Sequence, residues 1–303
     1  MLVTKGPHCT KNQLVPMRAF LLTSLFEILS WLPLRVLHGA GALLGPLVYR
    51  SSPGYARRLR ENLSLCCTGM SSAEFLEILR SSISEVGKAL LELPWAWRRS
   101  LPEIESRVRG VSGWEHVEAA QASGRGVIFL TPHMGCFEVI ALYVAMRWPL
   151  TVLYRPPKLG WIEPVMLAGR QRANLRLAKT DVSGVRALFK ALKRGEAIGL
   201  LPDQVPGKGE GEWVQFFGKP AYTMTLPIRL AENTGALILM VYAERLPKGE
   251  GYALHFAPFE DVTVEGMNRA LQETIRACPS QYLWSYNRYK VPAGVNPPDA
   301  GRA

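Results

Sequence analysis

The sequence predicts an α/β fold with a mixed, largely parallel central sheet flanked by helices. Two observations support this prediction. Short apolar runs, typical of buried strands, alternate with segments of about ten residues whose apolar positions recur at helical spacing. The chain has 303 residues, of which 48% are hydrophobic and 20% charged. That is enough for one large folded domain with a short additional anchor.

The first helix expected in this domain covers residues 72–98, where apolar residues recur at helical spacing behind a capping serine, Ser71 or Ser72. Strands and helices then alternate, beginning with the apolar run 126–131. Further strands are expected at 150–154, 197–201, 236–243 and 252–256, and further helices at 137–147, 161–175, 185–194, 226–233 and 264–277.

Residues 17–50 are apolar and precede the α/β domain. Glu27, Pro33 and Arg35 interrupt the segment, so that no apolar run reaches the roughly 20 residues that a membrane-spanning helix needs. We therefore expect a helical anchor that either lies in the membrane interface or dips into the bilayer and breaks at Pro33. The alternative is a buried N-terminal helical hairpin.

A basic cluster follows this anchor, as expected for contact with an anionic cytoplasmic leaflet. The cluster consists of Arg50, Arg57, Arg58 and Arg60. The predicted organisation is a polar extension at 1–16, the anchor at 17–50, a catalytic domain at 51–291 and a flexible tail at 292–303.

Charge and cysteine usage exclude several classes of protein. The net charge is +11, which suits an anionic membrane or an acidic carrier protein. No helix-turn-helix, zinc-finger or RNP-like motif is present, so we expect no nucleic-acid partner. The five cysteines include no C-x-x-C pair, which favours free thiols in a reducing compartment. The absence of H-E-x-x-H and G-x-S-x-G motifs argues against a zinc enzyme and an α/β-hydrolase. We expect neither a metal nor a cofactor.

The candidate catalytic pair is His133 and Glu138, an H-x4-E spacing just beyond the strand expected at 126–131. On one ideal helix these side chains would point about 140° apart. We therefore expect His133 in the loop and Glu138 in the first helical turn, folded back to contact the imidazole. A neutral imidazole can take the proton of a hydroxyl as it attacks a thioester, and a carboxylate on the other ring nitrogen fixes the tautomer. A lone structural histidine at a strand end is the simpler alternative, because H-x4-E alone is common.

Further motifs occur in a fixed order along the chain. Tyr154-Arg155-Pro156 is followed by Gly169-Arg170-Gln-Arg172-Ala-Asn174, Pro202-Asp203-Gln204, Phe216-Phe217-Gly218-Lys219 and Gln281-Tyr282-Leu283-Trp284. With the H-x4-E pair, this order resembles the bacterial lipid A biosynthesis lauroyl/myristoyl acyltransferase family, within the lysophospholipid acyltransferase superfamily. The resemblance extends from about Met17 to Lys290 and implies a glycerolipid-acyltransferase-like fold.

The resemblance implies that Arg170 and Asp203 are active-site residues that bind substrate. Arg170 lies on a basic segment with Arg172, where a guanidinium can hold an acceptor phosphate or carboxylate. Asp203 follows a strand and can orient Arg170 or a sugar hydroxyl, unless it is only a turn residue. Arg155 and Arg172 complete the substrate-binding candidates.

The implied reaction transfers a fatty acyl chain from an acyl-carrier protein to a lipid A precursor, at the cytoplasmic face of a bacterial inner membrane. The stretch Trp284-Ser-Tyr-Asn287-Arg288-Tyr-Lys290 departs from the family's W-x-H-R-R-[FW]-K tail, which puts the acceptor in question. Two alternatives remain: an O-acyltransferase acting on a lysophospholipid or another glycerolipid or aminolipid, and an inactive lipid-binding scaffold.

Overall fold

A computed structural model describes residues 11–157 and 160–298. Its centre is a seven-stranded sheet in the order β1-β9-β8-β2-β5-β3-β4. Strands β8 (Leu237–Arg245), β2 (Val127–Leu130), β5 (Ala197–Leu200), β3 (Leu150–Tyr154) and β4 (Leu175–Lys179) run parallel. Strand β9 (Tyr252–Pro258) is antiparallel to β8 and parallel to β1 (Val108–Ser112). The expected mixed, largely parallel sheet is confirmed.

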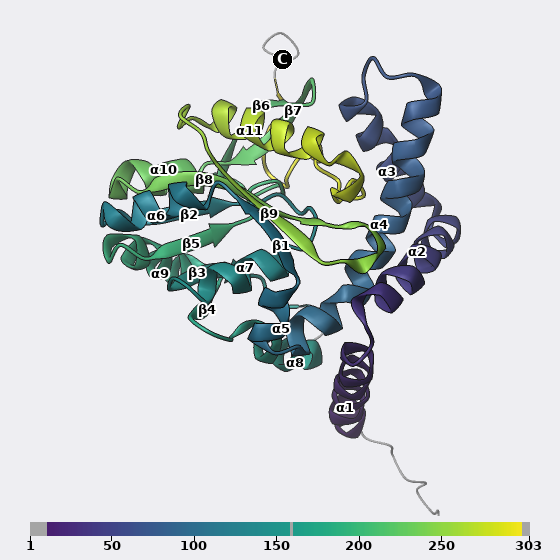
Figure 1. Cartoon of the computed structure of the whole chain (residues 1–303). Helices are drawn as coiled ribbons and strands as arrows, with labels where there is room; N and C mark the ends of the chain where they lie inside the picture. Colours follow the sequence, from purple (N-terminus) through teal and green to yellow (C-terminus); the bar gives the residue numbers. More distant parts are fainter. Residues whose placement is uncertain (1–10, 158–159, 299–303) are drawn as a thin grey trace, which may run out of the picture.

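Helices cover both faces of this sheet (Figure 1). One face packs on α6 (Trp114–Ala122) and α7 (Phe137–Ala145), and the other on α9 (Val182–Lys193), α10 (Leu226–Thr234) and α11 (Val264–Ala277). Strand β2 shows how the sequence builds both layers. Val127 and Phe129 enter the first core, whereas Ile128 and Leu130 enter the second. Alternate side chains of a strand point to opposite faces, so a central strand must be apolar throughout.

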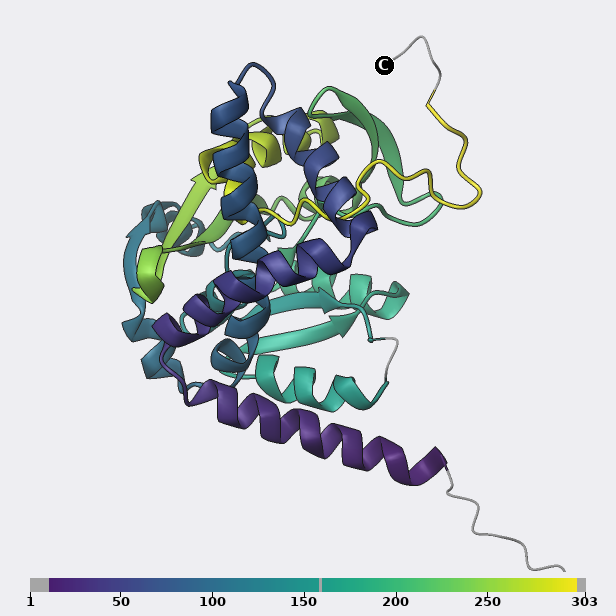
Figure 2. The same cartoon turned by 90° about the vertical axis from the view of Figure 1, so that its right-hand side faces the viewer.

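Helices α1 to α4 gather on one side of the sheet (Figures 1 and 2). They comprise α1 (Lys11–Ser30), α2 (Leu34–Ser51), α3 (Pro53–Cys66) and α4 (Ser72–Arg98). Ser71 caps α4 through a reciprocal contact with Glu74. Helices α2 and α4 cross in close backbone contact because Gly87 has no side chain at the crossing. A Cβ at Gly87 would lie 1.9 Å from the carbonyl oxygen of Gly41.

The apolar N-terminal segment breaks at Pro33, as predicted. Within the described residues no single helix has the length and apolar character to cross a bilayer. Ala19–Ser30 and Leu34–Ser51 meet that requirement only together, as a pair bent by 118°.

One predicted helix is wrong. Residues 161–175 form a short 3-10 turn (Gly160–Ile162), helix α8 (Glu163–Arg170) and the start of β4. The chain turns after α8, where Ala173 adopts a positive φ of 52°, and Leu175 then pairs with Leu150 of β3. The sequence reading also missed β1, helix α5 (Leu101–Ser106), helix α6 and the hairpin of β6 (Gly211–Phe216) and β7 (Lys219–Met224).

Candidate active site

His133 and Asp203 meet at the carboxyl edge of the sheet. Strands β2 and β5 are parallel neighbours, so the loops that follow them lie side by side. The Asp203 carboxylate accepts the backbone N–H of His133 at 2.9 Å and contacts its Nδ1 at 2.7 Å. Burial would raise the pKa of Asp203, but the charge and hydrogen bonds of His133 outweigh it and lower that pKa. An ionised Asp203 therefore fixes the imidazole with its proton on Nδ1.

The other ring nitrogen of His133 is thereby the basic one. Nε2 lies 3.1 Å from the Gln204 side-chain nitrogen, which donates to it in this tautomer. The His133 ring also contacts the Phe137 ring edge-on, with centroids 5.6 Å apart. The imidazole is thus held on two sides by polar groups and on a third by an aromatic ring.

Glu138 does not contact the imidazole, which corrects the expected His133–Glu138 contact. It lies in the first turn of α7, as predicted, but its carboxylate faces Arg170 at the end of α8. Arg170 Nε donates to both carboxylate oxygens, at 3.0 and 3.1 Å, and a second guanidinium nitrogen contacts Oε1. The Glu138 side chain is 6% exposed and that of Arg170 23%. Asp203 therefore orients His133 and not Arg170, and Arg170 is the partner of Glu138.

A glycine allows the loop between His133 and Glu138 to approach the sheet. Gly135 has a φ of +55°, and a Cβ there would lie 1.9 Å from the carbonyl oxygen of Ala243 in β8. That carbonyl accepts the N–H of Cys136 at 2.9 Å, and the Gly135 N–H donates to the Gln281 carbonyl. Only glycine fits this position without displacing the loop.

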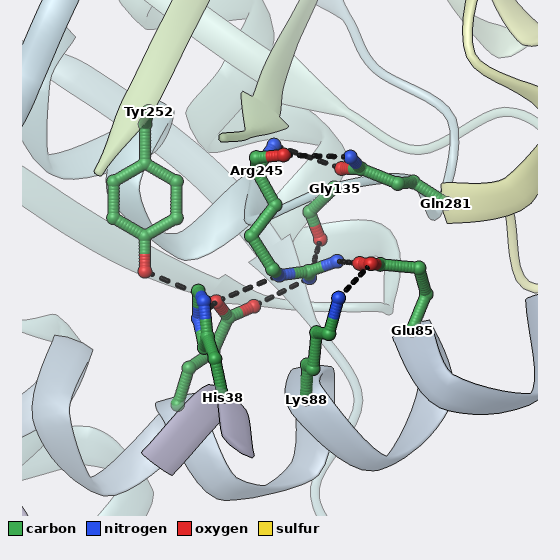
Figure 3. Close-up of polar contacts among 8 residues, drawn as sticks. His38, Glu85, Lys88, Gly135, Arg245, Tyr252 and Gln281 are labelled. Atoms are coloured by element: carbon green, nitrogen blue, oxygen red, sulfur yellow. Dashed lines mark hydrogen bonds and ion pairs between the residues drawn. The ribbon is translucent and has the colours of Figure 1, made fainter. Parts of the chain in front are cut away.

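A buried ion-pair network centred on Arg245 binds the loop between His133 and Glu138 (Figure 3). Arg245 at the end of β8 donates to the Gly135 carbonyl at 2.7 Å and to both Glu92 oxygens on α4, at 2.8 and 2.5 Å. It also donates to Glu85 at 2.7 Å. Burial would raise the pKa of Glu92, but Arg245 and a hydrogen bond from His38 lower it to about 2. The sequence did not predict this cluster because its members are far apart along the chain. The one feature that could have indicated it is the charged Arg245 at the end of an apolar strand.

Two mostly apolar cavities adjoin this site. The first, of about 80 Å³, lies between α7 and the sheet, and Thr131, Glu138, Val144, Val152 and Arg170 are among its lining residues. The second, of about 190 Å³, lies between α4 and the loop, and Leu90, His133 and Leu283 are among its lining residues. The site thus combines an oriented imidazole with apolar space for hydrocarbon chains.

Comparison with known proteins identifies the family. A family model described as "Bacterial lipid A biosynthesis acyltransferase" matches residues 7–291. The chain belongs to this family. It is 31% identical to the lipid A biosynthesis lauroyltransferase of Escherichia coli (strain K12), over 87% of this chain and 89% of the relative. Identity to the palmitoleoyltransferase of the same organism is 30%, over 86% and 87% of the two chains. Identity to its myristoyltransferase is 26%, over 84% and 82%.

The remaining candidate residues of this acyltransferase lie outside the His133 cluster. Arg172 donates to the carbonyls of Gly169, Arg99 and Ala96, so its guanidinium joins α8 to the end of α4. Arg155 is exposed just beyond β3. Substrate binding by these two arginines stays a prediction; in the described structure the Arg172 guanidinium binds backbone carbonyls.

The C-terminal tail of this acyltransferase supports the Asp203 loop. Arg288 is buried and donates to the Tyr222 carbonyl at 2.8 Å and to Thr223 Oγ1 at 2.6 Å. The Tyr286 hydroxyl accepts the backbone N–H of Val205, two residues beyond Asp203. Tyr286 stands where the family motif has histidine, so the departure in sequence touches the active-site loop directly. Asn287 is exposed.

Proposed function

We propose that this acyltransferase moves a fatty acyl chain from an acyl-carrier protein thioester to a hydroxyl of a lipid A precursor, with His133 as general base. The oriented His133–Asp203 pair beside apolar cavities is the observation that carries the proposal. The family supplies the lipid A branch, since the relatives are named as lipid A lauroyl-, palmitoleoyl- and myristoyltransferases.

The reaction proceeds by direct transfer. His133 Nε2 takes the proton of the acceptor hydroxyl as the oxygen attacks the thioester carbonyl carbon. The C–S bond of the tetrahedral adduct breaks, and the imidazolium gives its proton to the departing thiolate. The products are the new ester and the free carrier thiol. The acceptor hydroxyl takes the place of the Gln204 amide on Nε2, and Asp203 stabilises the imidazolium.

Glu138 and Arg170 act beside this base. Their bidentate pair fixes the guanidinium at the N-terminal turn of α7, next to the first cavity. Backbone N–H groups at the start of α7 stabilise the oxyanion of the adduct. The Glu138–Arg170 pair has no net charge, and its role is to hold the guanidinium beside this turn. Arg170 also suits a phosphate or carboxylate of the acceptor headgroup.

The proposal includes binding of the N-terminal helices to the cytoplasmic face of an inner membrane. Exposed apolar side chains lie on α1, on α2 and on the connection between them: Phe20, Leu21, Leu25, Ile28, Trp31, Val36, Leu43 and Leu47. An exposed apolar surface of this extent is unusual for a protein free in water and suits the membrane interface. The arginines at positions 50, 57, 58 and 60 flank it and favour anionic lipid.

A membrane-fraction assay tests this proposal with labelled acyl-carrier protein and two acceptors, a tetra-acylated lipid A precursor and a lysophospholipid. Wild type is compared with His133→Ala and Glu138→Ala. We expect transfer to the lipid A precursor by wild type and loss of at least about 10²-fold in both variants. Transfer only to the lysophospholipid would agree with the proposed catalytic residues but would show that the proposed acceptor is wrong. No transfer to either acceptor would favour the inactive scaffold.

A further inference from the structure

The two cavities lie on opposite sides of the first turn of α7. Phe137 and Glu138 line both of them. Among the described residues, His133 lines only the cavity next to α4, whereas Arg170 lines only the cavity between α7 and the sheet. A base must lie within hydrogen-bond reach of the hydroxyl that it deprotonates, about 2.6–3.2 Å. The nucleophile therefore approaches from the α4 side.

We infer that the cavity between α4 and the His133 loop, the α4 cavity, binds the hydrocarbon chain of the acceptor that carries the reacting hydroxyl. The donor's acyl chain then occupies the cavity between α7 and the sheet, the α7 cavity. This inference rests on the proposed function and deepens it. Both substrates carry a hydrocarbon chain, and the acyl transfer takes place at the two residues that the cavities share.

The walls of the α4 cavity fit a hydrocarbon chain. Val86, Ala89, Leu90 and Leu93 recur at helical spacing on α4 and form one wall, and Leu283 is part of the other. Three carboxylates also line it, those of Glu85, Glu92 and Glu138. Arg245 and Lys88 bind the first two and Arg170 binds the third, so each carboxylate charge is compensated by a cation.

The α4 cavity reaches the protein surface at Leu90, on the helix that α2 crosses. Leu90 is 49% exposed although it lines the cavity. It lies about one turn along α4 from Gly87, where α2 crosses in backbone contact. Helix α2 carries the exposed Leu43 and Leu47. A lipid whose headgroup stays at the interface can therefore insert its chain past Leu90 toward His133.

Two matched substitutions test this assignment. Ala89→Phe fills the α4 cavity, and Ala141→Phe fills the α7 cavity; both alanines are half-buried on helices. Bisubstrate kinetics in mixed micelles give KM separately for acyl-carrier protein and for the lipid A precursor. Blocking an apolar subsite changes selectivity by about 10-fold or more. We expect Ala89→Phe to raise only the acceptor KM by that factor, and Ala141→Phe to raise only the donor KM. Exchanged effects, or no change in acceptor KM for a folded Ala89→Phe, would overturn the inference.

Equilibrium binding separates this inference from the proposed function. Binding of a 3-hydroxy fatty acid to the full-length protein in micelles needs no turnover, so it reports on the cavity even if the lipid A precursor is not a substrate. We expect Ala89→Phe to weaken this binding about 10-fold and Ala141→Phe to leave it within about 2-fold of wild type. Equal weakening by both variants, or weakening by Ala141→Phe alone, would contradict the assignment. Thermal unfolding of both variants confirms that they fold.

Discussion

At the residue scale, the carboxylate that touches the His133 ring comes from the loop after a neighbouring strand, β5. Asp203 is 70 positions away in sequence and bonds both the ring and the backbone of His133. The nearer Glu138 is committed to Arg170. Two carboxylates at one sheet edge thus have separate tasks, one for the imidazole and one for the guanidinium.

Replacing Asp203 by Asn tests the first task. The amide keeps the shape but can leave the proton on the wrong ring nitrogen, so we expect kcat to fall about 10³-fold or more while folding is retained. Steady-state kinetics and circular dichroism measure both. Asp261→Asn, on an exposed carboxylate, serves as the control and should leave kcat unchanged. Wild-type kcat in Asp203→Asn would show that Asp203 does not orient the base.

Glu92 makes a pH-dependent contribution to stability. Its pKa is about 2 in the folded protein and about 4.3 in an unfolded chain. The contribution is therefore complete above about pH 4.3 and is lost as the pH falls toward 2, with a slope of at most about 1.4 kcal/mol per pH unit. Urea unfolding between pH 6 and 3 should give a shallower fall of the free energy of unfolding in Glu92→Gln/Arg245→Met than in wild type, while the contribution of other carboxylates with a lowered pKa, such as Asp203, is retained. Glu118→Gln, at an exposed position, should keep the wild-type slope.

The sequence identified the site residues better than their pairing. A histidine after a buried strand and an aspartate after another are visible as patterns, and both reach the predicted sheet edge. The contact between them requires that β2 and β5 are neighbours in the sheet. The order of strands in a sheet cannot be predicted from the local periodicity of the sequence. For the same reason the sequence could not distinguish the role of Arg172 from that of Arg170. Three backbone carbonyls, those of Gly169, Arg99 and Ala96, bind the Arg172 guanidinium away from the His133 cluster.

At the element scale, the crossing of α2 and α4 depends on glycine. Gly87→Leu would force the helices apart, because even a Cβ there lies 1.9 Å from the Gly41 oxygen. We expect a loss of about 1–3 kcal/mol in the free energy of unfolding, measured by urea denaturation. Gly39→Ala is the matched control, since a Cβ at Gly39 meets nothing within 4 Å. It should be neutral or stabilising by up to about 1 kcal/mol. An unchanged Gly87→Leu would mean that the helices separate readily.

Long, strongly periodic elements were predictable, and short edge elements were not. Helix α4 matches its predicted range because a full amphipathic repeat and a capping box mark it. Strand β4 has only five residues and includes Arg176 and Lys179, so it lacks the apolar run that marks a buried strand, and its first residue, Leu175, fell within the helix predicted at 161–175. Strand β1 is exposed along most of its length and therefore lacks an apolar signature.

At the scale of the whole molecule, the apolar surface of α1 and α2 predicts membrane attachment. Leu43→Glu/Leu47→Glu places two charges on the exposed side of α2. We expect binding to anionic vesicles to fall at least about 10-fold, since a charge at the interface opposes burial of apolar area. Vesicle sedimentation measures this, and Val182→Glu, on the distant helix α9, is the control. Equal binding by the double variant would locate the membrane face elsewhere.

The Arg245 network reaches into the N-terminal helices as well as the catalytic loop. His38 of α2 contacts Glu92, Glu92 binds Arg245, and Arg245 binds the Gly135 carbonyl. Because these contacts cross the predicted boundary at residue 51, we expect that the N-terminal helices cannot be removed without affecting the catalytic domain. A truncated enzyme lacking α1 and α2 would expose a buried salt bridge to water and loosen the loop that carries His133. We expect this truncated enzyme to be more soluble than the full-length protein but to have a lower turnover number. Extraction of the intact chain with detergent is therefore the better way to prepare active enzyme.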